Sequence, residues 1–221
     1  MSISLGNVIT ARNFNEKYHP EILKYLYLSS HYRTQMSVTD EKLLQTISAL
    51  NRIYSSLALA NKTIAEVDGE GVVDNSFEKK LTELDQKIAK GMNDDFNSSE
   101  LVAQIFEGVR TFNSLAFTKK KKNTNHKGLS ESFLKWMRKY GEMSALFNED
   151  PEFMLNRMDD ILIEMREINV DKVKDLLNQR NTARAEKDWT LADKLRDELD
   201  AMGVELLDGT DRGWKVKVNE Q

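Results

Sequence analysis

The 221-residue chain has 31% charged and 40% hydrophobic residues but only two prolines and ten glycines, a composition typical of a helical protein with room for two compact units. Because cysteine is absent, disulfide bonds and cysteine-ligated metal sites are excluded, and the net charge of -4 argues against a protein that coats DNA or RNA without selectivity. No apolar run approaches the roughly 20 residues of a membrane span and the sequence shows no signal peptide, so we expect a cytoplasmic protein without a membrane partner.

The first predicted helices are marked by their starts and by the spacing of their apolar residues. Pro20 suits the first turn of a helix, because its missing N–H would be unpaired there, and apolar residues at positions 22, 23, 26 and 27 follow at helical spacing. Thr39 begins a second, longer helix whose apolar residues lie on one face. That face consists of Leu43, Leu44, Ile47, Leu50, Ile53, Tyr54 and Leu57.

Two more helices follow a break at residues 68–71. The third is predicted from Ser76 to about Gly91, and Ser98 or Ser99 is expected to cap the fourth. The apolar face of the fourth helix holds Leu101, Val102, Ile105, Phe106, Val109 and Phe112. Because each of these neighbouring helices has one apolar face, we expect them to pack as a bundle.

The segment FTKKKKNTNHKG, at residues 117–128, lacks apolar periodicity and is predicted to be an exposed loop. Its lysines could contact an RNA backbone, but short lysine runs are common, which favours a solvated insertion. The next helix contains Phe133, Leu134, Trp136, Met137 and Tyr140. Trp136 is expected in the core, because its neighbours at helical spacing are also apolar.

The last part of the chain predicts a small separate module. One helix is expected from about Asp171 to Glu186, and a second ends at Gly203, a residue that suits a helix C-terminus. The segments VELL and WKVKV then predict a hairpin around residues 208–213. The predicted fold is mainly α, a helical bundle followed by a small α+β module with a C-terminal hairpin. Its expected parts are residues 1–37, a bundle of residues 38–168 and a module of residues 169–221.

This module also holds the first residues that point to a chemistry. Arg180 and Arg184 share a helix face. Trp189 lies just past the following turn, and Asp193 lies one helical turn further. A guanidinium donates to base edges, an indole stacks on a base and a carboxylate accepts from base amino groups, so this set can read unpaired RNA. The same residue types form salt bridges and pack in ordinary helices, and that interpretation stays open.

Three segments, in this order along the chain, resemble the C-terminal half of the cysteine–tRNA ligases, which are class I aminoacyl-tRNA synthetases. They are LKYLYLSSHYRTQM, MNDDFNSSE and LLNQRNTARAEKDWTLADKLRDELDAMGVELLDG. The first contains the family's His-Tyr-Arg corner as His31, Tyr32 and Arg33, and the second contains its Asp-Asp-Phe-Asn motif at residues 94–97. The third matches the family at Arg184, Lys187, Asp188, Trp189, Ala192 and Asp193.

The first residues, MSISLGN, resemble the family's Lys-Met-Ser-Lys-Ser signature loop. Met1, Ser2 and Ser4 match that loop, whereas Ile3 replaces its second lysine and the first lysine would precede the chain. In the family this loop lies over the ATP phosphates, where an isoleucine supplies no charge. The resemblance implies that the ATP site and the zinc-binding cysteines lie upstream. We therefore interpret Met1 as a cut, and expect no complete catalytic, metal or cofactor site and no activity of the chain alone.

The resemblance implies a whole enzyme that activates cysteine with ATP, carries zinc and attaches cysteine to tRNA(Cys). Residues 1–37 would then be a signature-loop remnant with a stem-contact helix, and the chain is expected to bind tRNA as a monomer and not DNA. The expected tRNA stem contacts are His31, Tyr32 and Arg33. A cation at a helix C-terminus explains the same three residues equally well. The residues expected to read the anticodon, guanine-cytosine-adenine, are Arg184, Trp189, Asp193 and Asp208.

Other interpretations concern the central motif and the function. Residues 94–97 are expected to anchor a helix start, with Phe96 buried and Asn97 as the cap, rather than to bind a metal. One alternative function is that of a related ligase that joins cysteine to an amino sugar, although such relatives lack the terminal anticodon module. The other alternative is a non-catalytic helical adaptor that binds a protein partner.

Overall fold

The computed structural model describes residues 10–116, 121–207 and 212–218, and their contacts divide the chain into two compact units between Leu155 and Asn156. The first unit ends at Leu155, and the second unit begins at Asn156. Within these ranges, no helix combines the length and the apolar character that crossing a membrane requires.

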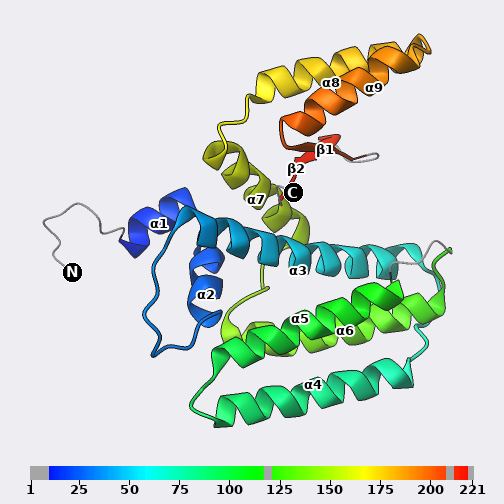
Figure 1. Ribbon diagram of the computed structural model, residues 1–221. Helices are drawn as coiled ribbons and strands as arrows, with labels where there is room; N and C mark the ends of the chain where they lie inside the picture. The colour runs from blue at the N-terminus through cyan, green and yellow to red at the C-terminus, as the bar shows by residue number, and fades with distance from the viewer. Residues whose placement is uncertain (1–9, 117–120, 208–211, 219–221) are drawn as a thin grey trace, which may run out of the picture. The chain divides into compact units, whose positions relative to one another are not determined.

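The first unit is helical throughout its regular structure (Figure 1). The helices are α1 (Ala11–Lys17), α2 (Pro20–Leu28), α3 (Asp40–Glu66), α4 (Asn75–Asn93), α5 (Ser98–Ala116), α6 (Thr124–Ser144) and the start of α7 (Pro151–Met165). Helix α5 packs against α4 and α6, and α3 packs against α6 and α2. The predicted helical bundle is confirmed.

Capping residues explain where several of these helices begin. Pro20 is at the start of α2 and Thr39 caps α3, as predicted. Helix α4 begins slightly earlier than expected, because the side chain of Asp74 accepts hydrogen bonds from the amides of Ser76 and Phe77. Helix α7 is missing from the sequence-based expectation, although Pro151 is its first residue.

The core of the bundle lies where the apolar faces meet. Leu50 and Tyr54 of α3 are fully buried, and the rings of Phe112 and Phe133 stack with their centroids 4.1 Å apart. Trp136 is 5% exposed, which confirms its predicted place in the core. At Gly108 of α5, an added Cβ would lie 2.5 Å from Cζ3 of the Trp136 ring, so the absence of a side chain permits this close approach.

The predicted loop over residues 117–128 is wrong at its end, because α6 begins at Thr124. The helix start is made by a capping box, in which the side chains of Asn123 and His126 bond to each other's backbone amides. Lys127 donates to the carbonyl oxygens of Val67 and Gly69, and the Lys122 ammonium donates to the Thr63 hydroxyl. These lysines are structural partners of the α3 end, and residues 117–120 lie outside the described ranges.

The second unit consists of a helical hairpin and a two-stranded antiparallel sheet, next to the end of α7. The elements are α8 (Val170–Ala185), α9 (Trp189–Ala201), β1 (Val204–Leu206) and β2 (Trp214–Val216). Lys187 turns the chain between the two helices with a φ of 63°, and Gly203 follows α9 with a φ of 75°. The predicted helix pair and the two antiparallel strands are confirmed, and residues 208–211 of the expected turn lie outside the described ranges.

Helix α7 holds the sheet within the second unit. A carboxylate oxygen of the buried Asp159 accepts from the amide of Val216, and the Arg166 guanidinium donates to the carbonyl oxygens of Lys217 and Val218. The boundary between the two compact units therefore lies within α7, before the predicted junction at residues 168–169. The finer division of the first unit at residue 37 stays a prediction.

Candidate nucleic-acid interface

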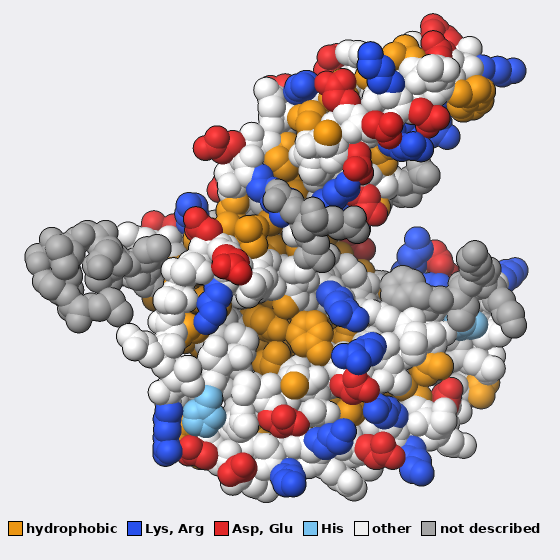
Figure 2. All heavy atoms as spheres, viewed as in Figure 1, with side chains coloured by type: hydrophobic (Ala, Val, Ile, Leu, Met, Phe, Trp, Pro, Cys, Tyr) orange, Lys and Arg blue, Asp and Glu red, His pale blue; other side chains and the backbone are white. Residues whose placement is uncertain are grey.

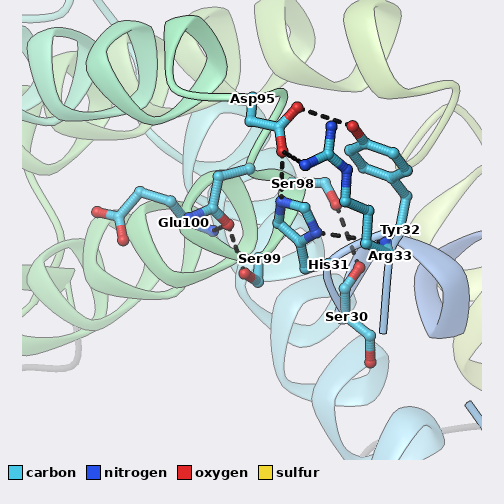
Figure 3. A network of polar contacts seen from close by, with 9 residues as sticks. Ser30, His31, Tyr32, Arg33, Asp95, Ser98, Ser99 and Glu100 are labelled. Carbon is cyan, nitrogen blue, oxygen red and sulfur yellow. Dashed lines mark hydrogen bonds and ion pairs between the residues drawn. The ribbon is translucent and has the colours of Figure 1, made fainter. Parts of the chain in front are cut away.

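The side chains of His31, Tyr32 and Arg33 converge on one carboxylate (Figure 3). They lie in a turn after α2, and Asp95 lies in the connection between α4 and α5. The Tyr32 hydroxyl donates to Asp95 Oδ1 over 2.7 Å, and the Arg33 guanidinium lies 3.1 Å from Oδ2. His31 Nε2 lies 3.7 Å from the same Oδ2. Two of the three segments that resemble the cysteine–tRNA ligases therefore meet in space.

This cluster presents a cation and aromatic rings to solvent. The rings of His31 and Tyr32 stack at 4.8 Å, and the guanidinium of Arg33 lies 5.4 Å from the centre of the Tyr32 ring. Tyr32 is 59% exposed and the Arg33 side chain is 69% exposed. The hydrogen bond to Asp95 raises the pKa of the Tyr32 hydroxyl, because the bond favours the protonated form that donates to the carboxylate.

The position of these residues also bears on the helix-dipole interpretation. Helix α2 has no basic residue in its last turn, and its end is capped by the amide of Ser29, which donates to the Tyr25 carbonyl oxygen. Arg33 faces the carboxylate of Asp95, which belongs to a distant part of the sequence. The partner of this cation is therefore Asp95.

The expectation for residues 94–97 is half right. Oδ1 of Asn97 accepts from the amide of Glu100, which confirms Asn97 as the cap of α5. The cap expected at Ser98 or Ser99 is wrong, because α5 already begins at Ser98. Phe96 is 71% exposed, and its predicted burial is wrong. The reason is the backbone, because Asp95 and Phe96 have φ angles of 57° and 52°, which turn the Phe96 side chain out of the core. Sequence reasoning missed Asp95 as the shared partner, since no local pattern links it to His31.

The predicted anticodon residues lie at and near the turn of the α8–α9 hairpin. Arg184 is in the last turn of α8, and Trp189 is the first residue of α9. Trp189 is 60% exposed, so it is not wedged between the two helices. Within the described ranges, the exposed Arg184 side chain has no hydrogen bond or ion pair, and Asp193 pairs with Arg196 at 3.2 Å.

Several expected residues lie outside the site that the structure describes. Asp208, the fourth predicted anticodon residue, and the signature-loop residues Met1, Ser2, Ile3 and Ser4 are outside the described ranges. Arg180, predicted on the same helix face as Arg184, is half-buried, and its Nε has no hydrogen-bond partner among the described residues.

Charged side chains of both signs are mixed on the face of the first unit that Figure 2 shows. Figure 2 shows basic and acidic side chains interspersed over the visible face of the helical bundle, without a broad patch of one sign. A surface of this kind does not attract nucleic acid strongly by net charge alone. On this face, an attraction for nucleic acid would depend on particular residues and not on a broad patch of positive charge.

Two segments of the chain match protein-family models, and each holds residues of one of the two sites. Residues 1–48 match the catalytic domain of class I (C) tRNA synthetases, and this range includes His31, Tyr32 and Arg33. Residues 170–212 match the anticodon binding domain of cysteinyl-tRNA ligase, and this range includes the exposed Arg184 and Trp189. Asp95 lies in neither matched range.

Cysteine–tRNA ligases of several bacteria are similar to nearly the whole chain. The ligase of Bdellovibrio bacteriovorus is 35% identical over 218 residues, which cover 98% of this chain and 45% of that ligase. The ligase of Syntrophotalea carbinolica is 32% identical over 219 residues, with the same two shares. That of Escherichia coli is 32% identical over 209 residues, which cover 95% of this chain and 40% of that ligase. The chain thus spans less than half the length of these relatives, and the predicted resemblance is confirmed.

Proposed function

On the premise that the chain is related to cysteine–tRNA ligases over 98% of its length, we propose that it is a tRNA-binding part of such an enzyme. The whole enzyme would activate cysteine with ATP and attach it to tRNA(Cys). One observation carries the proposal: the segment that matches an anticodon binding domain holds an arginine and a tryptophan that are both exposed beside one turn.

The chemistry of this turn suits unpaired bases. The exposed indole of Trp189 stacks on a base, and the Arg184 guanidinium donates to acceptors on a base edge. Asp193 accepts from an exocyclic amino group. Its ion pair with Arg196 is solvent-exposed and therefore weak, so a base can compete for the carboxylate. Asp208 is proposed as a second acceptor for the guanine-cytosine-adenine anticodon.

The first unit is proposed to contact the tRNA stem through His31, Tyr32 and Arg33. A phosphate contact by the exposed Arg33 positions the RNA without reading its sequence. The selectivity for tRNA(Cys) would then come from the second unit.

Cofactors, compartment and assembly complete the proposal. ATP and zinc would serve the whole enzyme, and among the described residues no group of three or more histidine, aspartate or glutamate side chains could hold a metal ion. We propose that the chain alone forms no cysteinyl adenylate, and that the protein acts in the cytoplasm as a monomer without binding DNA.

The two alternative functions make different predictions about RNA. A ligase that uses an amino sugar has no need of an anticodon module, so the match of residues 170–212 speaks against it. A helical adaptor that binds a protein partner would retain no tRNA, even at low salt.

The proposal is tested by measuring the affinity of the 221-residue chain for a tRNA transcript with the cysteine anticodon and for two transcripts with other anticodons. Trp189→Ala and Arg184→Ala should each weaken binding of the cognate transcript about 10-fold or more, since a stacked base contributes about 1–3 kcal/mol. Lys174→Ala removes the same charge as Arg184→Ala from the exposed surface of α8. It should cost little, and equally for all transcripts.

Three outcomes decide the matter. Selective loss with Trp189→Ala and Arg184→Ala, at an unchanged melting temperature, supports anticodon recognition. Unchanged cognate affinity of both variants means that the anticodon assignment is wrong. Failure of the parent chain to bind any transcript at low salt supports the adaptor instead.

A further inference from the structure

Asp95 is the common partner of the three residues that are proposed to contact the tRNA stem. Oδ1 accepts from the Tyr32 hydroxyl, and Oδ2 faces both the guanidinium of Arg33 and Nε2 of His31 (Figure 3). Both carboxylate oxygens are thus occupied by one turn of three residues. This turn and Asp95 are far apart in the sequence, so the contact is made by the tertiary fold.

The carboxylate leaves most of the Arg33 guanidinium open. Its Nη1 atom lies 3.1 Å from Asp95 Oδ2, and its side chain is 69% exposed. A guanidinium has five N–H donors in a planar fork, so a phosphate can bind the donors that Asp95 does not take. Arginine normally loses rotamer freedom when it binds a phosphate, and here the ion pair and the Tyr32 ring already restrict it.

The connection that carries Asp95 is held at both ends. The amide of Phe96 donates to the Met92 carbonyl oxygen at 3.2 Å, and that of Asn97 donates to the Gly91 carbonyl oxygen at 3.1 Å. Asp95 and Phe96 both have a left-handed backbone conformation. This conformation is unfavourable for phenylalanine, and because the Phe96 side chain is exposed, its burial does not compensate for the strain. The position of the carboxylate is therefore imposed by the ends of α4 and α5.

A carboxylate beside an RNA-binding arginine would weaken binding if only its charge mattered, because it repels phosphates. We propose that Asp95 is a positioning residue, which holds Arg33 and Tyr32 in the orientation in which they contact the phosphate backbone of tRNA. This inference rests on the proposed tRNA-binding function. It assigns to Asp95 an effect on affinity that is opposite in sign to its electrostatic effect.

That difference in sign gives a sharp test with a matched control. Asp95→Asn keeps the size of the side chain, and asparagine tolerates the left-handed backbone. Asp94→Asn removes the same charge one residue earlier, and within the described ranges Asp94 makes no side-chain bond to residues 31–33. Asp95→Asn should weaken binding of tRNA transcripts by about 3- to 10-fold, which corresponds to ordering one long side chain. Asp94→Asn should leave affinity unchanged or raise it.

Two further variants separate positioning from a general structural role. In a chain that carries Arg33→Ala, Asp95→Asn should cause a smaller loss than in the parent chain, because only Tyr32 is left for the carboxylate to hold. Tyr32→Phe removes the hydrogen bond to Oδ1 without changing the charge, and it should weaken binding in the same direction by a smaller factor. If Asp95→Asn lowers the melting temperature below the assay range, Tyr32→Phe replaces it, and its effect is measured in the parent chain and in the chain that carries Arg33→Ala.

The outcomes distinguish this inference from the proposed function. Asp95→Asn that binds as tightly as Asp94→Asn, or an unchanged loss in the Arg33→Ala background, would overturn the positioning role. If Arg33→Ala itself has no effect while Trp189→Ala does, the stem contact falls with the inference and anticodon recognition stands. If the parent chain binds no tRNA, the proposed function fails and this inference fails with it.

Discussion

Trp136 and Trp189 show two opposite uses of the same residue in the two units. Trp136 is 5% exposed, and its Nε1 donates to Asp85 of α4 over 2.7 Å. Trp189 starts α9 beside a turn and is 60% exposed. Burying an indole and satisfying its N–H stabilise a fold, whereas exposing the ring leaves its face available to another molecule. Residue type alone therefore does not separate a buried position from an exposed one.

The same contrast holds for the helices that carry these residues. Helix α3 buries one long face, including Ile47, Leu50 and Ile53, each with 0% exposure. Helix α8 buries Val173, Leu176 and Ala183 only, within the part of the chain that the structure describes. We expect the bundle to tolerate few substitutions on its apolar face. The turn of the α8–α9 helical hairpin should tolerate many. Three predictions test that difference.

The largest effect is expected for Leu50→Asp. It places a charge in a fully buried position, and we expect the free energy of unfolding to fall by about 5 kcal/mol. Gln45→Asp introduces the same carboxylate at an exposed position of α3 and should cost less than about 1 kcal/mol. Urea denaturation followed by helical circular dichroism measures both values. A Leu50→Asp chain that melts within a degree or two of the parent would contradict the assigned face.

The next largest effect on stability is expected when Trp136 is replaced, and little effect is expected when Trp189 is replaced. Trp136→Ala should lower the free energy of unfolding by about 3–5 kcal/mol, because it leaves a cavity and removes a donor to Asp85. Trp189→Ala should change it by less than about 0.5 kcal/mol, because the ring is mostly in solvent. Differential scanning calorimetry of the two variants compares the units directly. Equal losses would mean that Trp189 packs in solution and that the contrast between the two regions is wrong.

The smallest effect concerns the pH dependence of the second unit. Burial raises the pKa of Asp159 to about 6, although the Val216 amide and the charges of Arg212 and Lys215 lower it. A carboxyl group with a raised folded pKa binds more protons in the folded state, so stability falls as pH rises from the unfolded value of 3.8 towards 6, and is constant above that. The expected loss is about 2 kcal/mol.

Asp159→Asn should remove this slope, because asparagine keeps an acceptor for the Val216 amide and does not ionise. Hydrogen exchange of the Val216 amide between pH 4 and pH 7, corrected for the intrinsic rate, reports the local stability. Asp160→Asn is the matched control, since Asp160 is exposed and should leave the slope in place. A parent chain without any slope in this range would mean that Asp159 is better solvated than its burial indicates.

Much of the fold follows from local signals in the sequence. Thr39 caps a helix and the apolar residues behind it recur at helical spacing, so both the start of α3 and its buried face could be predicted. The same signals place Trp189 just after a turn. The start of α6 was harder, because its capping box uses Asn123 and His126 in a polar stretch that looks like a loop.

What could not be predicted depends on contacts between distant residues or on backbone conformation. Nothing local in the sequence indicates that the carboxylate of Asp95 meets the turn at His31, Tyr32 and Arg33, since the packing of several helices brings them together. Phe96 was expected in the core because of its apolar side chain. Its left-handed backbone, with a φ of 52°, instead directs the side chain away from the core.

The close approach of the Trp136 ring to Gly108 limits the residues that position 108 can hold. An added Cβ would lie 2.5 Å from a ring that is buried and hydrogen-bonded, so the ring cannot move aside easily. Every amino acid that a single nucleotide change can put in place of glycine carries a Cβ. In a mutational scan, the codon for Gly108 should therefore accept synonymous changes only. A second change that shrinks position 136 would have to come first, which makes this pair of positions a barrier to gradual sequence divergence.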